Sequence, residues 1–120
     1  MKTRTQSERE QLALLQGTLD VLILRTLMFG PQHGQGIARA IQETSEHVLL
    51  VDHGALYPAL QRLEAQKWIA AKWGTSSNNR KARFYVLTKA GREQLARQSS
   101  RWHRLAAAMS RVLGPAPEKD

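Results

Sequence analysis

A mostly helical α+β fold is predicted for this chain, because segments with helical spacing of apolar residues flank one candidate β-hairpin. Residues 54–66 place Leu56, Leu60 and Leu63 on a single helical face. Two strand-forming runs, 68–73 and 83–87, are separated by a segment rich in Gly, Ser and Asn, which predicts a hairpin with a long exposed tip over 74–80. An apolar stripe near heptad spacing follows, which predicts a long final helix.

Length and composition exclude several classes of protein. With 120 residues the chain forms one domain and an appended helix, and is short for an enzyme that must also build a deep cleft. It contains no cysteine, which excludes disulfides and thiolate metal sites and suits a reducing cytosol. Its apolar runs are far shorter than the roughly 18 residues of a membrane span, so we expect a soluble, cytoplasmic protein that uses no membrane.

No catalytic or cofactor site is predicted. Histidines 33, 47, 53 and 103 lack the compact spacing of metal ligands, and His33 is instead expected to fix the turn before the second helix. The sequence has no Gly-rich phosphate loop, no Ser-His-acid grouping and no paired catalytic carboxylates. We therefore expect neither an enzyme nor a metalloprotein.

Positive charge is concentrated in and beside the hairpin. The formal net charge is +8, and residues 65–92 hold seven of the 18 basic residues and no acidic ones, which leaves 11 basic against 10 acidic residues elsewhere. A solvated hairpin face is the simpler interpretation, but uncompensated cations are tolerated more readily where phosphate neutralises them. The cluster favours nucleic acid or another anionic surface as partner.

The first helix is predicted over 7–28, with Ser7 and Glu10 as a capping box and Gly17 as a weak point. Residues 1–16 are interpreted as a helical arm that packs on a partner subunit. A second helix is expected over 34–44 and a short strand over 47–51, because that run is rich in β-branched residues.

Asp52 is the expected N-terminal cap of the third helix, whose regular part should start at Gly54 or Ala55 because proline, here Pro58, is comfortable only in the first turn. The order is then helix, helix, short strand, helix, hairpin. This order is the winged helix-turn-helix arrangement, predicted over residues 17–88.

A final helix over 89–113 is predicted to begin at a Thr88 cap and to end at Gly114, followed by a frayed tail over 114–120. Its apolar stripe can pack on the same subunit. An intersubunit role is favoured, because a two-fold dimer presents two third helices to successive turns of DNA, roughly 34 Å apart. The stripe comprises Leu95, Trp102, Leu105, Ala106, Met109, Val112 and Leu113.

The sequence resembles the PadR family of bacterial transcriptional regulators, in the short form with a single C-terminal helix. The segments that carry this resemblance are 17–24, 30–34, 54–64, 68–69 and 83–91. The resemblance implies a cytoplasmic, nucleoid-associated homodimer that binds an inverted-repeat operator in double-stranded DNA and represses transcription. In some members of the family a small aromatic effector releases the repressor from DNA. Family members often carry Ser or Thr where this chain has Ala55, and an aromatic residue at the position of Gln35.

Candidate DNA contacts come from the third helix and from the hairpin, or wing, over 74–83. Tyr57 is expected near phosphate, although its ring can instead fill the core, and Gln61 and Arg62 either reach DNA or remain ordinary helix surface. The wing cations are expected to contact phosphates. The full predicted set is Ala55, Tyr57, Gln61, Arg62, Lys72, Arg80, Lys81 and Arg83.

Trp102 either anchors a dimer core or lines an effector cavity between subunits, together with Leu105, Ala106 and Met109. The predicted function is a dimeric, sequence-specific regulator, expected to be a repressor. The alternative is an interaction adaptor that keeps the winged-helix scaffold and uses its basic hairpin on an acidic partner.

Overall fold

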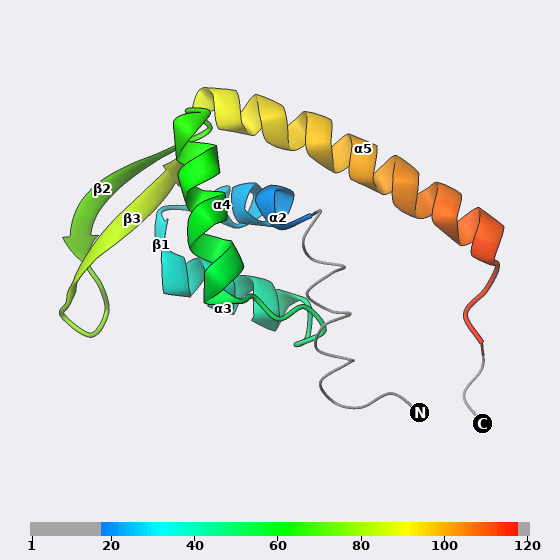
Figure 1. Cartoon of the computed structure of the whole chain (residues 1–120), viewed down its shortest axis with the longest axis horizontal. Helices are drawn as coiled ribbons and strands as arrows, with labels where there is room; N and C mark the ends of the chain where they lie inside the picture. The colour runs from blue at the N-terminus through cyan, green and yellow to red at the C-terminus, as the bar shows by residue number, and fades with distance from the viewer. Residues whose placement is uncertain (1–17, 118–120) are drawn as a thin grey trace.

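Four helices and three strands make up residues 18–117, the part of the chain that the computed structural model describes (Figure 1). They confirm the predicted mostly helical α+β fold. The predicted arm over 1–16, its capping box and the last three residues of the tail lie outside the described residues. In chain order the elements are α2 (Leu19–Leu27), β1 (Gln32–His33), α3 (Gly34–Thr44), α4 (His53–Ala65), β2 (Ile69–Thr75), β3 (Lys81–Leu87) and α5 (Lys89–Leu113).

The core lies where the apolar faces of α2, α3 and α4 meet. Leu56, Leu60 and Leu63 are at most 1% exposed, which confirms the buried face predicted for the third helix. From α2 and α3, Ile23 and Ile37 are fully buried against this face. Burial of each such side chain contributes about 1.5–3 kcal/mol to the stability of the fold relative to an exposed one. This packing therefore holds α4 in place.

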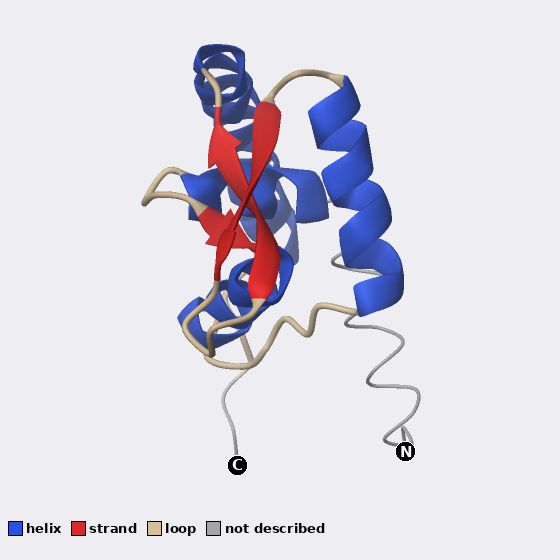
Figure 2. Ribbon diagram, turned by 90° about the vertical axis from the view of Figure 1, so that its left-hand side faces the viewer, coloured by secondary structure: helices blue, strands red, loops and turns tan. Residues whose placement is uncertain are grey.

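The hairpin of β2 and β3 forms a three-stranded antiparallel sheet with β1, in the order β1-β3-β2. Its ladder extends outward to the pair Thr75 and Lys81, so the strands are longer and the loop, 76–80, shorter than predicted. The Ser76 amide donates to the Arg80 carbonyl at 2.8 Å, which closes the loop. Figure 2 shows the hairpin standing beside α4. The name wing, used above for residues 74–83, is from here given to the whole hairpin of β2, β3 and the loop between them.

The prediction of a short strand over 47–51 is wrong. The strand beside the hairpin is Gln32–His33, which pairs with β3. Glu46 and His47 have positive φ angles of 53° and 64°, so the chain reverses after α3 and cannot continue into an extended run. Val51 is buried in the core and Leu49 packs against it, whereas Val48 is 57% exposed, so this segment is a loop that covers the core with only some of its apolar residues.

Helix α4 begins at His53, one or two residues before the predicted start at Gly54 or Ala55. The Asp52 side chain makes no capping hydrogen bond, contrary to its predicted role. Instead the Asp52 backbone carbonyl accepts the first helical hydrogen bonds, at 3.0 and 2.9 Å. Pro58 consequently lies beyond the first turn, on the exposed side of the helix, where its missing N–H removes one helical hydrogen bond.

Helix α5 is anchored at its N-terminus by the predicted cap. The Thr88 hydroxyl oxygen accepts a hydrogen bond from the Gly91 amide at 3.0 Å, and the hydroxyl donates to the Lys67 carbonyl at 2.8 Å. A Cβ at Gly91 would lie 2.0 Å from the backbone oxygen of Trp68, so only glycine permits this approach. The helix ends at Leu113, and Gly114 follows with a φ of 77°, as predicted.

The second half of α5 extends past the other helices (Figure 1). Leu95 is 6% exposed and packs within the subunit, whereas Trp102, Leu105 and Met109 are 44%, 58% and 51% exposed. The apolar stripe is therefore buried at its start and open to solvent towards its end. Within residues 18–117, no helix combines the length and the apolar character that crossing a membrane requires.

Candidate nucleic-acid interface

A cationic groove of about 410 Å³ lies between the wing and the first turns of α3 and α4. We call it the wing groove. Four of its lining residues are basic, and no carboxylate lines it. Hydroxyl and amide groups from the wing loop and from Gln35 complete a polar lining. The four basic residues are Arg39, Arg80, Lys81 and Arg83.

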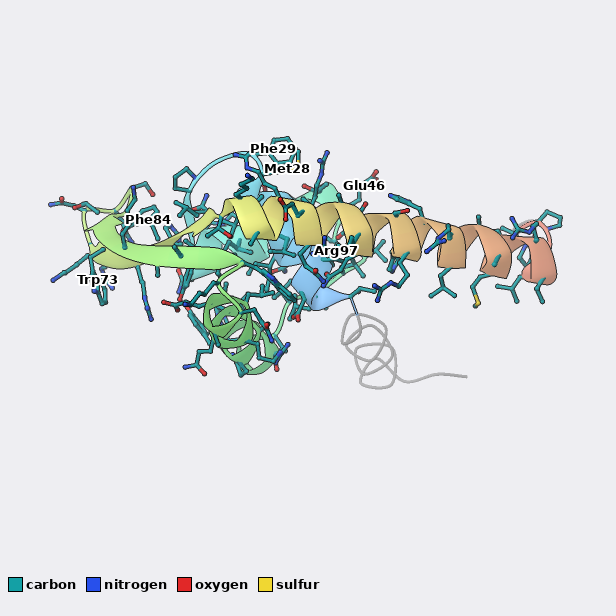
Figure 3. The ribbon with its side chains drawn as sticks, turned by 90° about the horizontal axis from the view of Figure 1, so that it is seen from above. Met28, Phe29, Glu46, Trp73, Phe84 and Arg97 are labelled. Atoms are coloured by element: carbon teal, nitrogen blue, oxygen red, sulfur yellow. The ribbon has the colours of Figure 1, made fainter. Side chains whose placement is uncertain are left out.

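The alternation of side chains along the wing decides which cations face this groove. Trp73 and Arg83 are directly paired, and Lys81 lies two residues from Arg83, so all three project from one face. Lys72 is paired with Phe84 and projects from the other face. Figure 3 shows Trp73 and Phe84 on opposite sides of the wing. The structure therefore brings Lys81 and Arg83 together and separates Lys72 from them.

An exposed tryptophan accompanies the wing cations. Trp73 is 65% exposed, and the Lys81 ammonium lies 5.2 Å from the centre of its ring. This distance permits a cation–π contact, which holds the Lys81 side chain over the wing.

On the opposite wall of the groove, Tyr57 of α4 packs over the start of α3. A Cβ at Gly34 would lie 3.1 Å from the Tyr57 ring, so the ring rests closely on this glycine. Tyr57 is 43% exposed and stacks on His53 with ring centres 6.0 Å apart. The two interpretations of Tyr57 therefore coexist, because the ring packs on the protein while part of it remains accessible.

His33 shapes the start of α3 as predicted. Its Nδ1 atom accepts a hydrogen bond from the Gly36 amide at 3.0 Å, which caps the helix. Its ring also contacts Phe84 edge-to-face, with centres 5.4 Å apart. These contacts join the first turn of α3 to the wing strand that carries Arg83.

The remaining predicted residues of α4 lie in different surroundings. Ala55 is half-buried and packs against the core. Gln61 is exposed and does not line the wing groove. Arg62 turns towards α2, where its guanidinium donates to the Asp20 carboxylate at 3.0 Å.

Arg83 also has a partner within the protein. Its guanidinium donates to the Glu64 carboxylate on α4 at 2.6 Å and lies 5.9 Å from the centre of the Tyr85 ring. Burial raises the pKa of the Tyr85 hydroxyl above its ordinary value, although the positive charge of Arg83 acts in the opposite direction. Tyr85 therefore remains a neutral hydrogen-bond donor at the floor of the groove near neutral pH.

A second, largely apolar groove of about 900 Å³ runs between α2, the loop after α3, and α5. Val21, Leu22, Leu49 and Leu95 line it, and Trp102 lies on its α5 wall. Leu105, Ala106 and Met109 are not among its lining residues, so only one of the four predicted dimer-core or effector residues reaches it. We call this hollow the helix groove.

Among the described residues, no three side chains of the types that bind metals gather into a candidate site. The chemistry available at the wing groove is that of cations, hydroxyls and amides. These groups bind anions and do not by themselves break bonds.

A helix-turn-helix pair, α3 and α4, followed by an antiparallel hairpin whose cations face the second helix, defines a winged helix-turn-helix protein with a DNA-binding fold. Residues 23–97 match the family described as Transcriptional regulator PadR-like family, and the chain belongs to that family. It is a transcription regulator and not an enzyme.

Similar proteins support this assignment. A PadR family transcription regulator from Clostridium difficile R20291 has 28% sequence identity and a TM-score of 0.69, over 80% of this chain and 98% of that one. A transcriptional regulator from Clostridium thermocellum has 20% identity and a TM-score of 0.76, over 85% and 99% of the two chains, which shows a common fold. An uncharacterized protein X from Lysinibacillus sphaericus is 28% identical over 89 residues, 74% of this chain and 82% of its own length.

Sequence reasoning missed the contribution of α3 to the wing groove. Gln35 and Arg39 line it, and neither belongs to the predicted set of DNA contacts. It also missed the carboxylate partners Asp20 and Glu64, which lie 42 and 19 residues from their arginines. The sequence contains one indication of the second pair. Glu64 is the last acidic residue before the acid-free basic stretch that begins at residue 65.

Proposed function

We propose that this protein binds an inverted-repeat operator in double-stranded DNA as a homodimer and represses transcription from it. The wing groove carries the proposal, because it gathers Arg39, Arg80 and Lys81, which have no ion-pair partner among the described residues, beside the exposed edge of α4. Such a surface releases counterions from the phosphate backbone and orients α4 towards the major groove. In this proposal Arg39, Arg80 and Lys81 contact phosphates, and Lys72 adds positive charge from the far face of the wing.

Base contacts are assigned to the exposed residues of α4. Gln61 is exposed and has the amide geometry that recognises adenine, and a phosphate contact is assigned to Tyr57, which is 43% exposed and lines the wing groove. The Arg62–Asp20 pair is longer and more exposed than the pair of Arg83 with Glu64, at 3.0 Å with side chains 58% and 36% exposed, and in this proposal Arg62 exchanges Asp20 for a phosphate or a base. Ala55 lies at the start of α4 and approaches DNA without a hydroxyl group.

Dimerisation is assigned to α5. Its exposed apolar residues Trp102, Leu105 and Met109, together with the half-buried Ala106, follow one side of a helix that extends beyond its own domain. A second copy of the same helix covers this stripe in a two-fold interface, where each subunit presents the same surface. The predicted arm over 1–16 is proposed to add to this interface.

A footprint on the DNA upstream of the protein's own gene tests the proposal. At moderate salt and with competitor DNA present, we expect protection of an inverted repeat whose half-sites are about 34 Å apart, and reduced transcription in vitro from a promoter that overlaps it. Protection that disappears with competitor DNA, or an acidic protein that displaces all duplexes, would favour the adaptor hypothesis.

We further propose that the helix groove, closed by the partner's α5, admits a small aromatic effector. Its lining is mainly apolar, and Trp102 on the α5 wall offers a ring on which a planar ligand can stack. Planar aromatic compounds are expected to quench tryptophan emission in the wild-type protein and not in Trp102→Leu. The tryptophans at 68 and 73 remain as internal references in that variant. An absence of quenching across a broad panel of compounds would leave Trp102 as a dimer anchor.

A further inference from the structure

The ion pair between Glu64 and Arg83 joins α4 to the wing. Glu64 is the penultimate residue of α4, and Arg83 lies in the outer half of β3. The Arg83 Nη2 atom lies 2.6 Å from the Glu64 Oε2 atom, with the two side chains 46% and 32% exposed. Within residues 18–117, no other ion pair or side-chain hydrogen bond links the wing to α4.

Strand β1 and the His33 ring hold the wing as far out as Phe84, and outward of Phe84 the wing has little besides the ion pair to hold its direction. Ile69 and Tyr85 are the buried wing residues, and both belong to its inner half. Outward of the pair Trp73 and Arg83, side chains are exposed or half-buried and contact mainly the wing itself. A two-stranded ribbon without a packed face twists easily, so one directed contact has a large influence on where its tip points.

The charges of this pair argue against a direct phosphate contact by Arg83. A carboxylate at 2.6 Å neutralises the guanidinium, so the pair as a unit contributes no net charge to counterion release. If Arg83 left Glu64 for a phosphate, an unpaired carboxylate would remain beside the wing and repel the DNA backbone. Arg83 is therefore better placed to orient the wing than to bind DNA.

We infer that Glu64 and Arg83 are positioning residues, which fix the angle between the wing and α4 so that Arg80, Lys81 and the exposed face of α4 reach the same DNA segment together. The inference rests on the proposed DNA binding. It gives the acidic residue Glu64 a role in DNA binding, and it gives Arg83 a role other than the phosphate contact predicted from the sequence.

The two roles of Arg83 predict opposite effects of removing the carboxylate. If Glu64 only restrains a phosphate-binding arginine, Glu64→Gln frees that arginine and tightens binding. If the pair sets the wing angle, Glu64→Gln and Arg83→Gln each weaken binding to the footprinted duplex about tenfold, and the double variant binds no worse than either single one. The swapped pair Glu64→Arg with Arg83→Glu then recovers most of the loss.

The salt dependence of DNA binding distinguishes a positioning pair from a direct phosphate contact. Loss of one phosphate contact per subunit would reduce the log-log salt slope of a dimer by about 2, whereas loss of a positioning pair leaves the slope unchanged. Glu93 is an exposed carboxylate on α5, and Glu93→Gln is the matched control for Glu64→Gln, because both substitutions remove one negative charge and Glu93 lies away from the wing. This control is expected to bind like the wild type.

A measurement without DNA separates this inference from the proposed function. Backbone amide order parameters of residues 81–84 are expected to fall in Glu64→Gln and Arg83→Gln and to stay at the wild-type level in Glu93→Gln. Unchanged order parameters would overturn the inference even if the wild type binds no DNA. If the wild type binds, tighter binding by Glu64→Gln, or a slope reduced by about 2 in Arg83→Gln, would overturn it as well.

Discussion

Replacing Arg80 and Lys81 by alanine is expected to weaken binding to every DNA duplex by about 100-fold or more at physiological salt. Both side chains are exposed at the mouth of the wing groove and lack an ion-pair partner among the described residues. If a dimer neutralises about six phosphates through Arg39, Arg80 and Lys81, its log-log salt slope is near −5. Removing four of these contacts should leave a slope near −2, measured by gel shift over a salt series.

The matched control for this experiment is the double variant Arg101→Ala with Arg104→Ala. It removes the same number of positive charges from exposed positions on α5, outside the wing groove. We expect the control to keep most of the affinity and the slope. Unchanged binding by the wing variant, or equal losses in both variants, would show that net charge and not the wing drives association.

The substitution Leu105→Glu is expected to convert the protein to a monomer at micromolar concentration and to weaken operator binding by at least about 100-fold, because one subunit contacts only one half-site. Leu105 is 58% exposed in the single chain, so the substitution does not disturb the core of the winged helix. In a dimer the same residue is desolvated, and a carboxylate there is costly. Sedimentation equilibrium gives the mass, and far-UV circular dichroism shows whether helix is retained.

Ala107→Glu is the matched control for Leu105→Glu. Ala107 is exposed on the same helix, and helical geometry places it on the side opposite Trp102 and Met109. This variant is expected to remain dimeric and to bind DNA normally. A dimeric Leu105→Glu protein would disprove the proposed interface while leaving the wing groove unaffected.

The main elements of the domain follow from local patterns in the sequence. The leucines of α4 repeat at helical spacing, and Thr88 directly precedes the first turn of α5, where its hydroxyl caps the helix. The turn residues between the strands predict the hairpin. The short strand was assigned to 47–51 because β-branched residues favour both strands and buried loops. What distinguishes the two is the positive φ at Glu46 and His47, a feature of the folded backbone.

The candidate site was predicted less completely than the fold. The sequence predicts DNA contacts by four wing cations, and three of them, Arg80, Lys81 and Arg83, line one groove. The strand register separates Lys72 from them, although alternation alone could indicate this only once the pairing was known. The α3 residues Gln35 and Arg39 enter the groove because of the angle at which helices pack, which no local pattern encodes.

By itself the sequence determined the family, the order of helices and hairpin, and the concentration of positive charge at the wing, because each depends on residues that are neighbours along the chain. Only the tertiary structure decided which cations are free and which are paired. Asp20 meets Arg62, and Glu64 meets Arg83, across distances in sequence that local spacing does not relate. Electrostatic interactions depend on separation in space, so the charge available to DNA becomes known only when the chain is folded.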